Sequence, residues 1–178
     1  MPTPKYCRET IAAIEAYLAQ QCFQFDPENI AHYTAVATHE AAHIVAGLAC
    51  DAVILEVEIN RPTTTKPSLG GANVSGLLDH HDAIISLAGW AWEEAHGDTA
   101  RAAEDLRYGK GCDSKNFDRN LQTARRLVRD AEPVIKACAA ALMKHLNRRG
   151  KLSPRNLTKV LARMSPHARG YAHYLKGH

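Results

Sequence analysis

The residues best suited to chemistry lie in one short run, His39-Glu40-Ala41-Ala42-His43. If the run is helical, its two histidines lie on one face, with Cβ atoms about 5–6 Å apart. Two imidazoles so placed can each bind the same zinc ion at about 2.0–2.1 Å. Glu40 lies about 100° further round the helix, where its carboxylate can take a proton from a zinc-bound water. This is the H-E-x-x-H pattern of zinc peptidases, and it predicts His39 and His43 as metal ligands and Glu40 as the catalytic base.

The segment around this motif is predicted to be one long helix from Pro27 to Leu48. Asp26, Pro27 and Glu28 form a helix start signal, in which an acid caps the helix and proline occupies its first turn. No other proline or glycine occurs before Gly47. The helix would be apolar on most of its sides, which is typical of a buried helix. Buried histidines need polar partners, and either a metal ion or backbone carbonyl groups would meet that need.

A small sheet is expected beside this helix, on the evidence of alternating apolar residues in 51–60. The residues predicted to share one face of that strand are Val53, Leu55, Val57 and Ile59. Residues 61–71 are rich in Pro, Thr and Gly and predict a loop, which a short return strand at 72–78 would follow. Before the motif helix, an N-terminal helix is predicted within residues 1–25.

The rest of the chain is predicted to be helical, with a break at Gly97-Asp98 and another at Gly109-Lys110-Gly111. The expected helices span 79–96, 99–108, 114–130, 133–146 and a last one that begins at Ser153-Pro154. Residues 165–178 have no clear periodicity and are expected to form a C-terminal arm. The predicted fold class is therefore mainly α (α+β), a helical zincin-like peptidase domain with a small hairpin next to the motif helix. All of residues 1–178 would belong to this single domain.

The composition is ordinary for a soluble globular protein, with 46% hydrophobic and 23% charged residues. No run approaches the 18 apolar residues of a membrane-spanning helix, and the first residues lack the apolar core of a secretory signal. The five cysteines are scattered and form no C-x-x-C pair. They predict reduced thiols in a cytoplasmic protein and no cysteine zinc site.

Charge is distributed unevenly along the chain. Residues 1–118 hold 8 Lys/Arg and 17 Asp/Glu, whereas residues 119–178 hold 14 Lys/Arg and 2 Asp/Glu. The basic part can bind a polyanion, attract the acidic part of the same chain, or simply form solvated helix faces. The residues that a polyanion would meet are Arg125, Arg126, Arg129, Arg148, Arg149, Lys151 and Arg155. No nucleic-acid recognition motif or aromatic stacking pattern accompanies them, so nucleic acid is the least favoured partner.

Three stretches within about residues 28–164 carry a resemblance to a known family. They are THEAAHIVAG with the following LEVEINRP and LGG, then SLAGWAWEEAHG, then NLQTARRLVRDAEPVIKACAAALMKHL. In this order they resemble the peptidase domain of the FtsH-type zinc metalloproteases. The chain departs from that family at Ala42, where the family has glycine, and it contains neither the AAA+ ATPase module nor the membrane anchor. The resemblance implies a stand-alone peptidase fold with Zn²⁺ as cofactor and no motor.

A catalytic zinc ion usually has three protein ligands, so a third is expected. The resemblance implies an aspartate at the start of the helix that follows the paired glutamates, and Asp98 matches that position. The same residue would also suit a simple helix cap. Asp105 is the second candidate ligand. Glu93 and Glu94 are the third, since other zinc peptidases take a glutamate from a nearby helix.

Three functions follow as hypotheses. The first is an ATP-independent zinc metallopeptidase that acts on unfolded or flexible polypeptides, with an extended substrate paired to the strand near Glu56. The second is a catalytically inactive, zinc-containing module that binds peptides or regulates a partner. The third is a polyanion-binding helical protein. No phosphate-binding G-x-x-x-x-G-K-[ST] loop occurs, which argues against the use of ATP. The sequence leaves open a homo-oligomer.

Overall fold

The computed structural model describes residues 30–59, 70–75, 78–96, 99, 102–146 and 151–175. Its elements are α2 (Ile30–Ala49), β1 (Val53–Ile59), β2 (Gly70–Ser75), α3 (Asp79–His96), α4 (Ala103–Cys112), η2 (Ser114–Asn116), α5 (Phe117–His145), α6 (Pro154–Ala168) and η3 (Arg169–Tyr174). The fold is mainly helical with one small antiparallel sheet, which confirms the predicted fold class at that level. The helix predicted within residues 1–25 lies outside the described residues. Within the described ranges, none of the helices combines the length and apolar character needed to cross a membrane.

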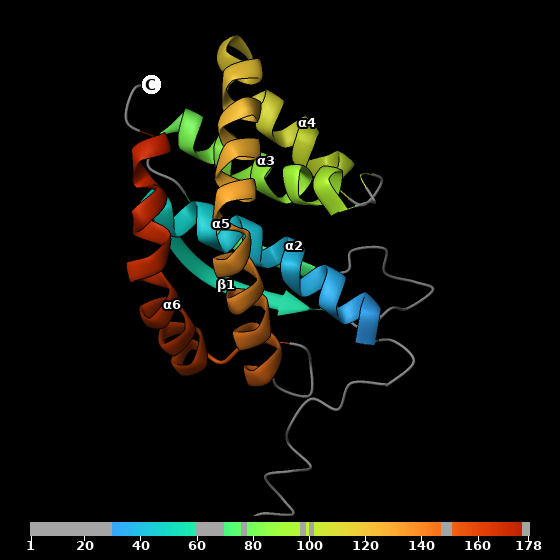
Figure 1. Cartoon of the computed structure of the whole chain (residues 1–178), viewed down its shortest axis with the longest axis vertical. Helices are drawn as coiled ribbons and strands as arrows, with labels where there is room; N and C mark the ends of the chain where they lie inside the picture. The colour runs from blue at the N-terminus through green and yellow to red at the C-terminus, as the bar shows by residue number, and fades with distance from the viewer. Residues whose placement is uncertain are drawn as a thin grey trace, which may run out of the picture.

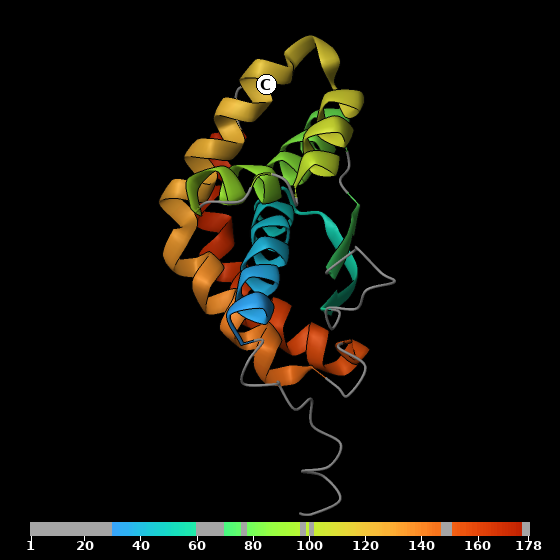
Figure 2. The same cartoon turned by 90° about the vertical axis from the view of Figure 1, so that its right-hand side faces the viewer.

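The motif helix α2 is the centre of the fold. It packs against α3, α5, α6 and both strands, and its apolar side chains form much of the core. Figure 2 shows α2 running between the hairpin on one side and the α5–α6 pair on the other. The two helices α3 and α4 lie together at one end of the molecule (Figure 1). The predicted burial of this helix is therefore confirmed, and its histidines face neighbours rather than bulk water.

The sheet consists of β1 and β2 in antiparallel register, as expected. Val57 and Ile59 are buried as predicted, but the prediction is wrong for Val53 and Leu55, which are 55% and 61% exposed. The register is irregular around Leu55, where β1 has one residue more than β2. Such a bulge reverses the alternation of side chains on one side of it. Ile54 accordingly takes the buried place.

The second edge of β1 is also occupied. The Leu152 N–H donates to the Val57 carbonyl oxygen at 3.2 Å, and Lys151 forms an antiparallel bridge with Glu58. The Lys151 ammonium lies 2.7 Å from a Glu56 carboxylate oxygen and 2.9 Å from one of Glu58. The strand near Glu56, which was expected to pair with a substrate, therefore has backbone neighbours on both sides.

The prediction is confirmed for α3, which spans Asp79–His96, but not for α4. Instead of ending before Gly109, α4 continues to Cys112. Gly109 is buried, and a Cβ atom added to it would lie 2.6 Å from Cγ of Leu87 on α3. The glycine therefore permits the close approach of two helices and does not end one, which is the physical reason for the wrong prediction.

The two helices predicted at 114–130 and 133–146 are one continuous helix, α5, with Pro133 in its interior. A proline removes one helical hydrogen bond and usually kinks or ends a helix. Here the apolar stripe continues across it, with Ala131 and Ile135 both fully buried. Packing against α2 on both sides of Pro133 has overridden the local preference.

The last helix begins as predicted, with Pro154 in its first turn and the Ser153 side chain accepting a hydrogen bond from the Asn156 N–H. Part of the segment expected to form a C-terminal arm is packed against the domain. The Tyr171 hydroxyl donates to the Asp130 carbonyl oxygen at 3.0 Å, and Leu175 is buried. These contacts attach the described end of the chain to α5 and the core.

Candidate metal centre

Three side chains from two helices converge at one point. Nε2 of His39 and Nε2 of His43, both on α2, lie 3.1 Å apart. Oδ2 of Asp105, on α4, lies 3.2 Å from the first nitrogen and 3.6 Å from the second. Ligand atoms about 2.0–2.1 Å from a tetrahedral zinc ion lie about 3.3–3.4 Å from one another. The three atoms therefore have the spacing of one face of a zinc tetrahedron, and the fourth corner is left for water or substrate.

The outer nitrogens of both imidazoles face groups on α3. Nδ1 of His43 donates to the Ile85 carbonyl oxygen at 2.8 Å. Nδ1 of His39 lies 3.3 Å from a carboxylate oxygen of Glu93, at ion-pair distance but without a well-aligned hydrogen bond. Partners of this kind keep the proton on Nδ1 and leave Nε2 free to bind a metal. Glu93 therefore lies behind His39 as an orienting carboxylate.

The electrostatics of the centre favour a cation. Burial opposes the charged form of Asp105, but its hydrogen bonds to His39 and His43 outweigh burial and hold the pKa of this carboxyl well below its usual range. Burial also opposes the charged form of His39, which by itself would lower the pKa of this imidazole. Asp105 and Glu93 outweigh that effect and raise the pKa to about 10. A proton on His39 thus occupies the place of positive charge that a divalent ion would take.

Glu40 lies beside this cluster in the interior. It is 4% exposed, and burial raises the pKa of its carboxyl, an effect that the neighbouring His43 and His39 reduce. The Ala72 N–H of β2 also hydrogen-bonds to the carboxylate. A carboxylate with a raised pKa beside a candidate metal site is suited to exchange protons with water.

Sequence reasoning missed the role of Gly89. A Cβ atom added at Gly89 on α3 would lie 2.3 Å from Nε2 and 2.4 Å from Cε1 of His43, and 2.9 Å from Cε1 of His39. The absence of a side chain therefore provides the space that both imidazoles occupy. The available signal was an isolated glycine inside a strong helical pattern, which often marks close packing.

Two residues of α3 position the helix that carries Asp105, and the sequence did not reveal them either. The Ser86 hydroxyl donates to the Asp105 carbonyl oxygen at 2.9 Å. Leu87 packs against Gly109, which lies four residues after Asp105 on the same face of α4. Ser86 and Leu87, which are adjacent on α3, thus fix the position of α4 and with it the position of the Asp105 carboxylate relative to α2.

The candidates for the third ligand have different outcomes. Asp98, the first choice, lies outside the described residues. Asp105, the second, is the carboxylate that the structure brings to His39 and His43. Glu93 is close to the centre without facing it, and Glu94 forms a two-pronged pair with Arg125 at 2.5 and 2.7 Å.

We expect Asp105→Ala to lower the affinity for zinc by about 100-fold or more, because it removes an atom at ligand distance from both imidazoles. Asp98→Ala is expected to change the affinity much less. Titration of both variants with zinc, against a competing chelator of known affinity, measures the difference. The reverse order of affinities would restore Asp98 as the third ligand.

The basic second part of the chain pairs with the acidic first part. Arg125 binds Glu94 and lies over the Trp90 ring at 5.7 Å, and Arg169 lies 3.4 Å from Asp51. Lys151 binds two glutamates of β1. Arg148 and Arg149 lie outside the described residues. These pairs favour the interpretation that the two parts of the chain attract each other.

The centre is assembled from groups far apart in the sequence. Two imidazoles of α2, one carboxylate of α4, a buried glutamate and two partners on α3 meet within one small volume. Comparisons with protein-family models, curated proteins and solved structures found no match for this chain.

Proposed function

We propose that this chain is a zinc metallopeptidase that hydrolyses unfolded or flexible polypeptides without ATP. One observation carries the proposal, namely the tetrahedral spacing of His39 Nε2, His43 Nε2 and Asp105 Oδ2 beside the buried carboxylate of Glu40. The resemblance of the motif segments to the FtsH-type peptidases supports it. Zinc bound there would supply a Lewis acid that polarises a carbonyl group and lowers the pKa of water.

Glu40 is the base and then the acid of the proposed reaction. It accepts a proton as the water oxygen bonds to the carbonyl carbon of the substrate. It then returns that proton to the amide nitrogen as the carbon–nitrogen bond breaks. One water is consumed, and the products are a carboxylate and an amine. His43 and His39 stay fixed through Ile85 and Glu93, so the geometry persists through the cycle.

The outer edge of β2 is the proposed position of the substrate backbone. Within the described ranges the sheet has two strands, with β1 on one side of β2. The Ala72 N–H bonds to Glu40, so this part of β2 passes directly beside the base. An extended peptide that pairs with this edge would bring its carbonyl groups to the metal centre. This replaces the earlier expectation that β1 near Glu56 receives the substrate.

The proposal predicts about one zinc ion per chain and metal-dependent cleavage of unfolded protein. The test uses one substrate protein in its folded and denatured forms, with and without ATP, and with and without a chelator. Zinc-loaded protein should cut the denatured form, spare the folded form and ignore ATP, because unfolding is what exposes an extended segment. His43→Ala, which loses a ligand, serves as the metal-free control.

Each outcome separates the candidate functions. Zinc binding without cleavage of any denatured substrate would favour the inactive, peptide-binding module. Wild-type zinc content in His39→Ala and His43→Ala would remove the metal centre itself. Cleavage of the folded substrate at a rate that increases with ATP would contradict the proposal that hydrolysis proceeds without ATP.

A further inference from the structure

The helix that carries the third ligand is exposed to solvent along much of its length. Of the ten residues of α4, Gly109 is its buried member, and Tyr108 is 64% exposed. The other exposed positions are Ala103, Glu104, Arg107, Lys110 and Gly111. A helix of this length is not stable alone, and segments with few buried apolar contacts open first in a native protein. Helix α4 packs against α3 and reaches α2 through the Asp105 carboxylate.

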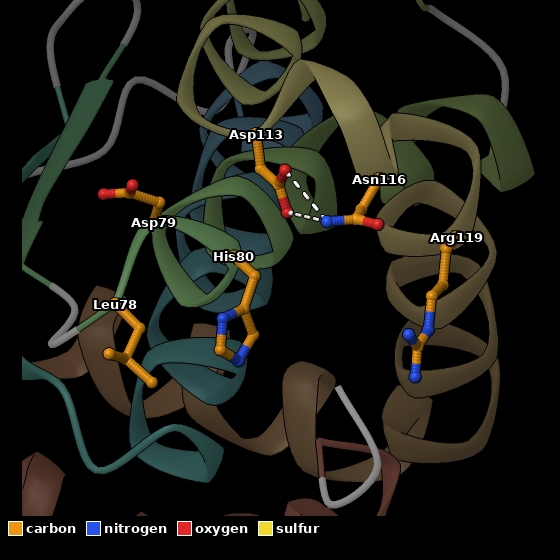
Figure 3. A pocket seen from close by; sticks show the side chains of 6 residues that line it. All are labelled: Leu78, Asp79, His80, Asp113, Asn116 and Arg119. Carbon is orange, nitrogen blue, oxygen red and sulfur yellow. Dashed lines mark hydrogen bonds between the residues drawn. The ribbon is translucent and has the colours of Figure 1, made fainter.

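The C-terminal end of α4 is fixed to α5. The Asp113 carboxylate accepts hydrogen bonds from the amide of Asn116 at 3.1 Å and from that of Asn120 at 2.9 Å. Figure 3 shows the Asp113–Asn116 part of this network. Asn120 is fully buried in α5, so the network fastens the corner where α4 ends. A pocket of about 320 Å³ lies beside it, between this corner and the start of α3 at Leu78 and His80. The corner is thus attached to α5 and has free space on its α3 side.

The N-terminal end of α4 is held differently. Its first turn begins after Ala102 without a side-chain cap. At this end Leu106 packs against the core, the Ser86 hydroxyl donates to the Asp105 carbonyl oxygen, and the Asp105 carboxylate lies beside the two imidazoles of α2. Three carboxylates, those of Glu40, Glu93 and Asp105, gather around these imidazoles. A divalent cation between them adds attraction between this end of α4 and α2.

We propose that α4 is a hinged helix, which turns about Asp113 and is closed against α2 by the metal ion that Asp105 binds. The proposal rests on the metal centre of the proposed function and is independent of hydrolysis. Because coupling between two equilibria is reciprocal, any change that opens α4 weakens metal binding, and removal of the metal opens α4. The metal therefore stabilises the arrangement in which Asp105 faces both imidazoles, and its removal increases the population in which α4 is open.

Hydrogen exchange of the full chain, with added Zn²⁺ and with a chelator, tests this coupling. Backbone amides of residues 103–112 should exchange about tenfold or more faster without zinc, whereas amides of 121–142 in α5 serve as the reference and should change little. Equal protection of residues 103–112 in both states, with zinc bound at the centre, would overturn the hinge. Absence of zinc binding would overturn both the hinge and the proposed function.

A matched pair of glycine variants on α4 separates the hinge from a general loss of stability. In Gly109→Ala the new methyl group would press on Leu87, so zinc affinity should fall about tenfold and residues 103–112 should exchange faster even with zinc present. Gly111→Ala meets no atom within 4 Å and should match the wild type or protect α4 slightly. Equal zinc affinity in the two variants would contradict the coupling.

Discussion

Replacement of Glu40 by glutamine is expected to leave the zinc content unchanged and to lower kcat for peptide hydrolysis by about 10²–10⁴-fold. Glutamine has nearly the shape of glutamate and can still accept the hydrogen bond from the Ala72 N–H. It cannot take a proton from water. The ligand atoms of His39, His43 and Asp105 are not altered, so the metal should remain. Metal analysis and initial rates on a denatured substrate, measured on the same preparation, check both parts.

Two controls make this result specific. Glu94→Gln changes a glutamate that pairs with Arg125 on the surface, and it should retain zinc and activity. Glu40→Asp keeps the carboxylate but withdraws it by about one methylene, so a small residual activity is expected. A Glu40→Gln enzyme with wild-type kcat would remove Glu40 as the base. A loss of zinc in that variant would instead give the residue a role in holding the site.

Replacement of Gly89 by alanine is expected to abolish tight zinc binding, although Gly89 is not a ligand. The added methyl carbon would lie 2.3 Å from Nε2 of His43, the atom proposed to bind the metal. The imidazoles must move or α3 must shift, and overpacking of a core typically destabilises a protein by about 1–3 kcal/mol. Ligand displacement should lower the zinc affinity by about 100-fold or more. Competition titration and thermal unfolding of the metal-free protein separate the two effects.

The control is Gly111→Ala, which also replaces a helical glycine but has open space around it. It should bind zinc as the wild type does and be as stable or slightly more stable. Wild-type zinc affinity in Gly89→Ala would mean that the imidazoles can bind the metal in another arrangement. The spacing measured at the centre would then not be the one that binds zinc.

Much of the framework could be predicted because its signals are local. The buried motif helix, the hairpin, the bounds of α3 and the start of α6 at Pro154 follow from periodicity and capping residues. The spacing of His39 and His43 placed both imidazoles on one face, and the structure agrees. These features depend on residues within about one or two helical turns.

The remaining features depend on contacts between distant segments. The burial of Ile54 in place of Leu55 results from a bulge that a regular alternation cannot contain. Gly109 lies inside α4 because Leu87 packs against it. Pro133 lies inside α5 because the residues before and after it, Ala131 and Ile135, are buried in the core. Asp105 becomes the nearest carboxylate to the histidines only after α3 and α4 have packed together. Asp98 was placed first because of the family resemblance, and it lies outside the described residues, so its place as the third ligand stays a prediction.

The central position of α2 has a consequence for synthesis on the ribosome. This helix is made before α5 and α6, which cover it and are completed about 120 residues later. At a synthesis rate of about 5–20 residues per second, the apolar surface of α2 stays without these two helices for roughly 6–24 s. Contacts between segments so far apart in the chain also form slowly. The nascent chain therefore passes through a period in which its most apolar helix needs protection from aggregation, by a chaperone or by transient contacts with its own hairpin.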